Sequence, residues 1–321
     1  MGPIRNGECG CGRESLVEAI SAFLAHYKVR DISEIVPALE RIIDEAGTEA
    51  IEFLGQRLAL AGMEWGYYVR DPLVRRMHHI FADHFLQEVP VLSGTEHLIG
   101  VADKPVVIVT NHLSYSDAHV LDYLLHKVDA GRLSDRLTVV AGPKVYTHIA
   151  RRFSSLCFGT IKTPQSTALA TEEAVMSLRE VARAARRSLQ VAQERLRIGE
   201  ALLVFAEGTR SRSGQMQPLL TGAARYLQSP NTWVLPIGMI GTERLFPIGE
   251  DSLNPVPLTL RIGRPIQASV LWELAQGDRQ RLIDCVGFAI GELLPRAYRG
   301  AYDAAVRPDA HAFRLSREVF R

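Results

Sequence analysis

The sequence predicts an α/β protein with a mostly parallel, open sheet flanked by helices and preceded by a small N-terminal helical bundle. Residues 15–89 carry apolar side chains at helical spacing, whereas the chain after Pro90 alternates short β-branched runs with helical stretches. Of the 321 residues, 47% are hydrophobic, which is enough to bury a large core. We divide the chain into a helical bundle (1–90), an α/β domain (91–300) and a C-terminal tail (301–321).

Four short-linked amphipathic helices are expected in the bundle. The second follows Ser33 as N-cap and ends at Gly47, and the third covers residues 49–61. In the fourth, Asp71 suits the N-cap and Pro72 the first helical position, and the helix stops before Pro90. The first helix is indicated by an apolar stripe formed by Leu16, Ile20, Phe23, Leu24 and Tyr27.

Five apolar runs in the second part of the chain are expected to be strands buried on both faces, as in parallel sheets. Helices over residues 118–127 and 172–197 lie between them. Pro236, inside one run, predicts an edge, a bulge or a strand end there. For the charged C-terminal tail, both a docked helix and a loose segment stay open. The five runs are Val106–Thr110, Leu137–Ala141, Ala201–Phe205, Val234–Met239 and Leu258–Ile262.

Composition excludes several classes of protein. Lys and Arg total 37 against 36 Asp and Glu, so a formal net charge of +1 favours no nucleic acid partner. No apolar run approaches the roughly 18–20 residues of a membrane-spanning helix, and the polar start lacks the pattern of a signal peptide. We therefore expect a cytoplasmic protein. The four cysteines are scattered and fit reduced thiols better than a disulfide framework or a zinc site.

Positive charge is concentrated in one stretch. Residues 144–197 contain 10 basic and 4 acidic side chains, while residues 8–96 contain 8 basic and 15 acidic ones. The basic stretch is either an ordinary solvated helix face or a landing surface for an anionic carrier. Its cations include Lys144, Arg151, Arg152, Arg183, Arg186 and Arg187.

The first candidate motif, Asn-His-x4-Asp, follows the strand Val106–Thr110. Reacting groups collect at the carboxyl ends of strands in open α/β sheets. His112 can take a proton from a hydroxyl, because its ordinary pKa lies near working pH, and Asp117 can orient its ring. The structural alternative is that Asp117 merely caps the next helix.

The second candidate motif, Phe-Ala-Glu-Gly-Thr-Arg, follows the strand Ala201–Phe205 and so belongs at the same sheet edge. Arg210 offers a planar fork suited to phosphate, and Gly208 allows close backbone approach. Glu207 would hold an arginine or an acceptor hydroxyl. Lys162 adds a cation at a possible strand end. The alternatives are a polar turn with a surface ion pair and a plain surface lysine.

Together with Gly-x-Ile-Lys and Leu-Pro-Ile-Gly, these motifs resemble those of the glycerolipid acyltransferase family, with its HX4D motif, over residues 98–266. The helical bundle without a membrane helix is similar to the layout of soluble plastid-type glycerol-3-phosphate acyltransferases. Ala206 stands where the family usually has Pro, and Lys162 where it usually has Arg. The resemblance implies that His112 and Asp117 form the catalytic pair, and that the acceptor phosphate is bound by Glu207, Gly208, Thr209 and Arg210.

This resemblance implies direct transfer of a fatty acyl group to a hydroxyl of glycerol 3-phosphate or 1-acylglycerol 3-phosphate in phospholipid synthesis. The donor would be acyl-CoA or acyl carrier protein, reached through the basic stretch, with no metal or other cofactor. Arg210, with Lys162 and Arg212, would bind the phosphate, and contact with the membrane surface would be peripheral. Three alternatives stay open: a non-glycerolipid hydroxyl acceptor, a thioesterase-like hydrolase, and a non-catalytic acyl-carrier or lipid-binding module.

Overall fold

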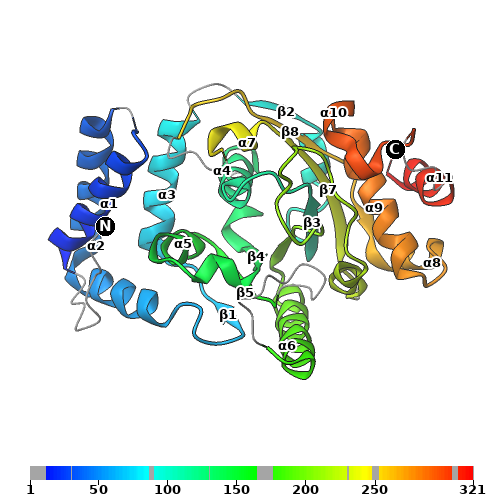
Figure 1. Ribbon diagram of the computed structural model, residues 1–321, viewed down its shortest axis with the longest axis horizontal. Coiled ribbons are helices and arrows are strands. Elements are labelled where there is room, and N and C mark those ends of the chain that lie inside the picture. The colour runs from blue at the N-terminus through cyan, green and yellow to red at the C-terminus, as the bar shows by residue number, and fades with distance from the viewer. Residues whose placement is uncertain are drawn as a thin grey trace.

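The computed structural model describes residues 12–29, 31–86, 90–129, 131–164, 176–229, 231–247, 253–305 and 310–320 (Figure 1). The helices are α1 (Arg13–His26), α2 (Ile32–Leu60), α3 (Pro72–Phe85), α4 (Asp117–Asp129), α5 (Ile149–Ser155), α6 (Leu178–Arg197), α7 (Thr242–Leu245), α8 (Ala268–Leu274), α9 (Arg279–Leu293), α10 (Arg296–Arg299) and α11 (Ala310–Val319). The strands are β1 (Tyr67–Tyr68), β2 (Val91–Ser93), β3 (Val106–Thr110), β4 (Leu137–Ala141), β5 (Gly159–Lys162), β6 (Ala201–Val204), β7 (Trp233–Ile240), β8 (Thr259–Ile262) and β9 (Ile266–Gln267). Short 3-10 turns include η3 (Pro143–Tyr146) and η5 (Thr221–Gln228).

One sheet contains all these strands, in the order β1-β5-β4-β6-β3-β7-β8-β2, with β9 also beside β7. Neighbouring pairs are parallel except at β1–β5, β7–β8 and β7–β9. The predicted class, a mostly parallel sheet flanked by helices, is confirmed. Each of the five predicted strands forms within one residue of its expected bounds, because continuous apolar runs of this length can be buried on both faces of a sheet.

Pro236 lies inside the sheet and not on an edge strand. Its strand β7 pairs with β3 along one side, while along the other side it pairs with β9 up to Val234 and with β8 from Ile237 onward. Pro236 falls between these two partner strands. A residue without an N–H is tolerated at such a break in the ladder, so the break explains how proline fits an interior strand.

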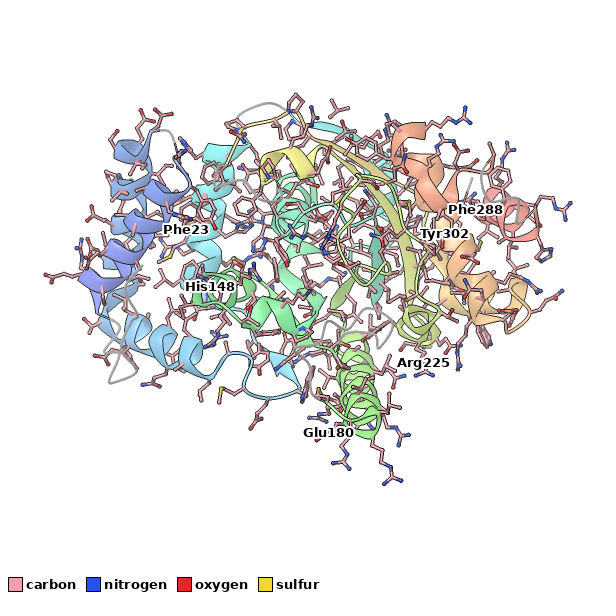
Figure 2. The ribbon with its side chains drawn as sticks, viewed as in Figure 1. Phe23, His148, Glu180, Arg225, Phe288 and Tyr302 are labelled. Atoms are coloured by element: carbon pink, nitrogen blue, oxygen red, sulfur yellow. The ribbon has the colours of Figure 1, made fainter. Side chains whose placement is uncertain are left out.

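Alternating side chains of the central strands feed two hydrophobic layers. Val106 and Ile108 point into a core shared with α1 to α4, and Val107 and Val109 point into a second core shared with α6, α8, α9 and α11. Figure 2 shows the second layer at Phe288 of α9, whose ring packs edge-on against Tyr302 with ring centroids 5.2 Å apart. The sheet is thus the middle of three layers.

The N-terminal helices follow the predicted pattern with one shifted cap. The second and third predicted helices are the two parts of α2, which meet at Gly47, where φ is +79°. The N-cap of α2 is Asp31, and the prediction of Ser33 is wrong because the helix begins one position before that serine. Asp71 caps α3 as predicted, with Oδ1 accepting from the N–H groups of Leu73 and Val74.

The helical segment and the sheet share one core. Side chains of α1 to α3 pack in the same cluster as those of α4 and the central strands, and β1, from the connection between α2 and α3, joins an edge of the sheet. No pattern in the sequence predicted β1, since two residues carry no periodicity. The domain boundary at residue 90 stays a prediction.

The interface between α3 and α4 is unusually polar for a buried one. Arg75 of α3 donates to both carboxylate oxygens of Asp122 of α4, each at 2.9 Å, and Asp122 is completely buried. Beside this pair, His78 packs against His119, with ring centroids 5.1 Å apart. Burial is the main cause that lowers the pKa of His78 to about 3. The first residue of α4 belongs to the candidate site, so the contacts between α3 and α4 hold the helix that carries this residue.

The helix predicted over residues 172–197 begins at Leu178 after the N-cap Ser177, and residues 172–175 lie outside the described residues. In the tail, α11 packs on the second core through Ala312 and Leu315. Cys157 and Cys285 are buried free thiols, while Cys9 and Cys11 fall outside the described residues. None of the described helices combines the length and apolar composition needed to cross a membrane.

Candidate active site

The loop after β3 is fixed to the neighbouring strand by Asn111. The side-chain amide of Asn111 donates to the carbonyl of Met239 at 2.9 Å, and its carbonyl oxygen accepts from the Met239 N–H at 2.8 Å. Asn111 is 1% exposed, so no water competes for these bonds. The sequence had assigned no role to this residue; the structure makes it the anchor of the candidate motif.

His112 and Asp117 form a hydrogen-bonded pair, with 2.8 Å between Nδ1 and Oδ2. Asp117, the first residue of α4, is completely buried, and the same oxygen accepts from the N–H groups of Leu113 and Ser114 at 2.7 and 3.0 Å. A carboxylate only accepts hydrogen bonds, so the proton of a neutral His112 ring belongs on Nδ1. Nε2 is then left as the basic nitrogen.

Glu207 supports the backbone of the histidine. Its Oε1 accepts from the His112 N–H and its Oε2 from the Gln217 N–H, each at 2.8 Å. Burial is the main cause that raises the pKa of Glu207 to about 7, while the two backbone bonds act in the opposite direction. Of its two predicted roles, holding an arginine is not found among the described residues, where both oxygens accept from backbone amides and Glu207 does not line the pocket described below. Holding an acceptor hydroxyl stays a prediction.

The ring of Phe205 stacks on the ring of His112, with centroids 4.1 Å apart and planes inclined by 23°. Phe205 follows β6, the strand next to β3, so both rings leave the sheet at the same edge. The contact restricts the imidazole to one plane. Because its two rings are distant in the sequence, residue spacing carried no signal for this stacking.

A pocket of about 590 Å³ opens at this edge of the sheet. It brings together the histidine, three predicted residues of the second motif and Arg212, whereas Asp117, Glu207 and Lys162 are not among its lining residues. Cations of the basic stretch, Lys144 and Arg151, also line it, as do the small or apolar side chains Ala185 and Leu189 of α6. The predicted residues that line it are His112, Gly208, Thr209, Arg210 and Arg212.

Lys162 is turned toward a different part of the molecule. Its ammonium donates to the carbonyl of Gly62 at 2.5 Å and lies over the rings of Trp65 and Tyr146. Burial is the main cause that lowers its pKa. The expectation that Lys162 contacts the acceptor phosphate is therefore corrected: the lysine at the end of β5 binds the turn after α2 instead.

A second pocket, of about 410 Å³, also borders the histidine loop. Arg212 lines both pockets, and Leu113 and Tyr298 line only the second. The exposed Arg183, Arg186 and Arg187 lie on α6, which also contributes to the wall of the first pocket. Whether these arginines form a landing surface for a carrier stays a prediction.

The chain is similar in sequence to known acyltransferases. A family model described as Acyltransferase matches residues 80–240. A chloroplastic 1-acyl-sn-glycerol-3-phosphate acyltransferase of Arabidopsis thaliana is 25% identical over 221 residues, which are 67% of this chain and 55% of that protein. A 1-acyl-sn-glycerol-3-phosphate acyltransferase of Chlamydomonas reinhardtii is 28% identical over 195 residues, 60% of this chain and 49% of that protein. This chain thus spans about half the length of these curated relatives. The crystal structure of the 1-acyl-sn-glycerophosphate acyltransferase PlsC of Thermotoga maritima aligns with a TM-score of 0.49 and 18% identity, covering 88% of this chain and 97% of that one.

Proposed function

Since the chain belongs to the acyltransferase family, whose model spans residues 80–240, we propose that it transfers a fatty acyl group from an acyl thioester to a hydroxyl of 1-acylglycerol 3-phosphate. The observation that carries the proposal is the His112–Asp117 pair, bonded at 2.8 Å, with His112 on the wall of a pocket that also contains Arg210. This acceptor is preferred to glycerol 3-phosphate because the relatives named above are 1-acyl-sn-glycerol-3-phosphate acyltransferases.

In the proposed reaction His112 acts as general base. Its Nε2 takes the proton of the acceptor hydroxyl, and the oxygen attacks the thioester carbonyl carbon. The C–S bond then breaks, and the leaving thiolate takes the proton back from the imidazolium. Asp117 stabilises the imidazolium and holds the ring. Such a base supplies typically about 10² to 10⁴ in rate, so positioning of the two substrates must supply much of the remainder.

Direct transfer without an acyl-enzyme suits the described thiols. Cys157 and Cys285 are buried and do not line the pocket. Burial raises the pKa of both, to about 12 for Cys285. A thiolate nucleophile would be costly at either position.

The acceptor phosphate would be bound by Arg210 of the second motif and by Arg212, two residues after it. Arg210 and the exposed Arg212 both line the pocket of His112. A planar guanidinium pairs with two phosphate oxygens at once. Binding this remote group would place the free hydroxyl against His112 and spend binding energy on orientation. The donor is acyl-CoA or acyl carrier protein. Because the acceptor carries one acyl chain, the protein would bind it in the cytoplasm while in peripheral contact with a membrane surface.

The experiment that tests the proposal measures release of free thiol from a long-chain acyl-CoA and from acyl carrier protein. Each donor is tried with 1-acylglycerol 3-phosphate, with glycerol 3-phosphate, and with no acceptor. We expect release that depends on 1-acylglycerol 3-phosphate in the wild type and in the control His26→Ala, an exposed histidine of α1. His112→Ala should abolish it. Release without acceptor would indicate a thioesterase-like hydrolase, and no release under any condition would favour a binding module.

A further inference from the structure

Two arginines from different parts of the chain lie over one tyrosine ring in the pocket. The guanidinium carbon of Arg210, in the loop after β6, lies 3.8 Å from the ring centroid of Tyr115. That of Arg151, in α5, lies 4.7 Å from the same centroid. Tyr115 belongs to the histidine motif, three residues after His112. All three side chains line the pocket and are partly buried.

Neither guanidinium is neutralised by a neighbour. Within the described part of the chain, no carboxylate lies within ion-pair distance of Arg151 or Arg210, and the only hydrogen bond of the Arg151 side chain goes to the carbonyl of Lys144, at 3.2 Å. By contrast, Arg57 and Arg75, which are also partly buried, each pair with an aspartate. Two like charges held close together without a counter-ion form a site for an anion.

Their shared contact with one ring holds the two guanidiniums near enough for one phosphate group to contact both. The two guanidinium carbons cannot lie further apart than the sum of their distances to the shared ring. A phosphate monoester offers three oxygens, and each guanidinium can donate to one or two of them. The π system of the tyrosine ring attracts both cations. The ring therefore prepares the two arginines for the same ligand.

We propose that Arg151 and Arg210 form one clamp for the phosphate monoester of the acceptor, with Tyr115, whose ring both contact, as the positioning residue. The inference rests on the proposed function and adds Arg151 to its site. Arg151 takes the place in the clamp that the sequence had assigned to Lys162, which binds the turn after α2. The free hydroxyl of a glycerol phosphate is only a few bonds from its phosphate, which fits a clamp adjoining the histidine loop.

Steady-state kinetics with a matched control test the clamp. The variant is Arg151→Ala. The control is Arg152→Ala, the adjacent arginine, which donates to the carbonyl of Tyr146 at 2.8 Å and does not line the pocket. We expect Arg151→Ala to raise KM for 1-acylglycerol 3-phosphate roughly tenfold to a hundredfold, as for loss of a hydrogen bond to a charged group. Its kcat and its KM for acyl-CoA should stay near wild type, and Arg152→Ala should retain the wild-type KM for 1-acylglycerol 3-phosphate.

Charge and geometry are separated by two further comparisons. Arg151→Lys keeps the charge without the fork and should show an intermediate KM. Tyr115→Phe keeps the aromatic face and should retain the wild-type KM, whereas Tyr115→Leu should raise it with a smaller effect on kcat. Equal KM values for 1-acylglycerol 3-phosphate in Arg151→Ala and Arg152→Ala would overturn the clamp. So would a rise in KM confined to acyl-CoA, because the phosphate bound would then belong to the donor.

Equilibrium binding separates this inference from the proposed function. A short-chain 1-acylglycerol 3-phosphate, used below its critical micelle concentration, is titrated calorimetrically into wild type, Arg151→Ala and Arg152→Ala. A Kd that rises roughly tenfold to a hundredfold only in Arg151→Ala supports the clamp even if no acyl transfer is observed. Absence of binding to the wild type, or equal Kd values in all three proteins, overturns the clamp whatever the enzyme activity.

Discussion

Both backbone polar groups of His112 are bonded to the segment that begins with Glu207. The His112 N–H donates to Oε1 of Glu207 at 2.8 Å, and the His112 carbonyl accepts from the N–H of Ser211 at 2.7 Å. The ring is held separately, by Asp117 at Nδ1 and by the face of Phe205. The two motifs thus depend on each other, and a change in the second is expected to move the base of the first.

Glu207→Gln should reduce kcat and lower stability. The amide keeps one acceptor oxygen but turns its NH2 group toward a backbone N–H, so one of the two bonds is lost and two donors face each other. An unsatisfied buried donor costs about 1–3 kcal/mol. Urea denaturation and kcat should both report the loss, with Glu194→Gln, on the exposed side of α6, as the control. Unchanged values in both measurements would contradict the supporting role of Glu207.

Asp117→Asn should lower kcat by about 10² to 10⁴ if the pair acts as proposed. The variant places an amide beside Nδ1 and the two backbone N–H groups, which favours the wrong ring tautomer or an altered loop. Turnover at saturating donor and acceptor is the measurement. Asp103→Asn, an exposed carboxylate that pairs with Arg132, is the control and should retain full turnover. Wild-type turnover in Asp117→Asn would remove the orienting role.

Phe205→Leu should have a smaller effect. Leucine fills part of the volume but loses the aromatic contact with His112, and such contacts contribute about 0.5–1.5 kcal/mol. A decrease in kcat of roughly twofold to tenfold is expected, with little change in KM for either substrate. Initial rates over a range of both substrates will show whether the loss is confined to kcat. A rise in KM with an unchanged kcat would indicate that Phe205 contributes to substrate binding instead.

Arg75→Met should destabilise the protein by about 3–5 kcal/mol, because the completely buried Asp122 would lose its partner. The matched control is Arg76→Met. That arginine pairs with Glu45 at the surface, and its replacement should lower the free energy of unfolding by less than about 1 kcal/mol. Equilibrium unfolding in urea compares the two. Similar values for both variants would show that the α3–α4 ion pair contributes little.

Stability should fall as the pH drops below about 6.5, through His78. Its pKa is lowered from 6.5 to about 3 in the folded protein, mainly by burial. The unfolded chain therefore binds a proton between these values while the folded chain does not, which favours unfolding toward acid. Near pH 5 the loss is about 2 kcal/mol. Tm measured at pH 7 and pH 5 should show a drop that is smaller in His78→Gln, and an equal drop in both proteins would exclude His78 as the cause.

The sequence predicted those features that are continuous in the chain. Long apolar runs indicated the main strands, and five residues of spacing placed Asp117 within reach of His112. Contacts between distant segments carried no such signal. Arg151 contacts Tyr115 because α5 packs beside the histidine motif in the folded chain. Lys162 is directed elsewhere because the carbonyl of Gly62 and the rings of Trp65 and Tyr146 lie around its ammonium group. These outcomes depend on how the layers pack.

Asn111 shows how the chain leaves the sheet at the reacting edge without a loss of hydrogen bonding. Its side chain donates to the carbonyl and accepts from the N–H of Met239, the same two atoms that a neighbouring strand would use. The side-chain amide therefore imitates a peptide group and continues the ladder for one step, while the main chain turns toward the pocket. Aspartate has the same shape but no donor, so Asn111→Asp would leave a carbonyl unpaired and put a charge inside the sheet.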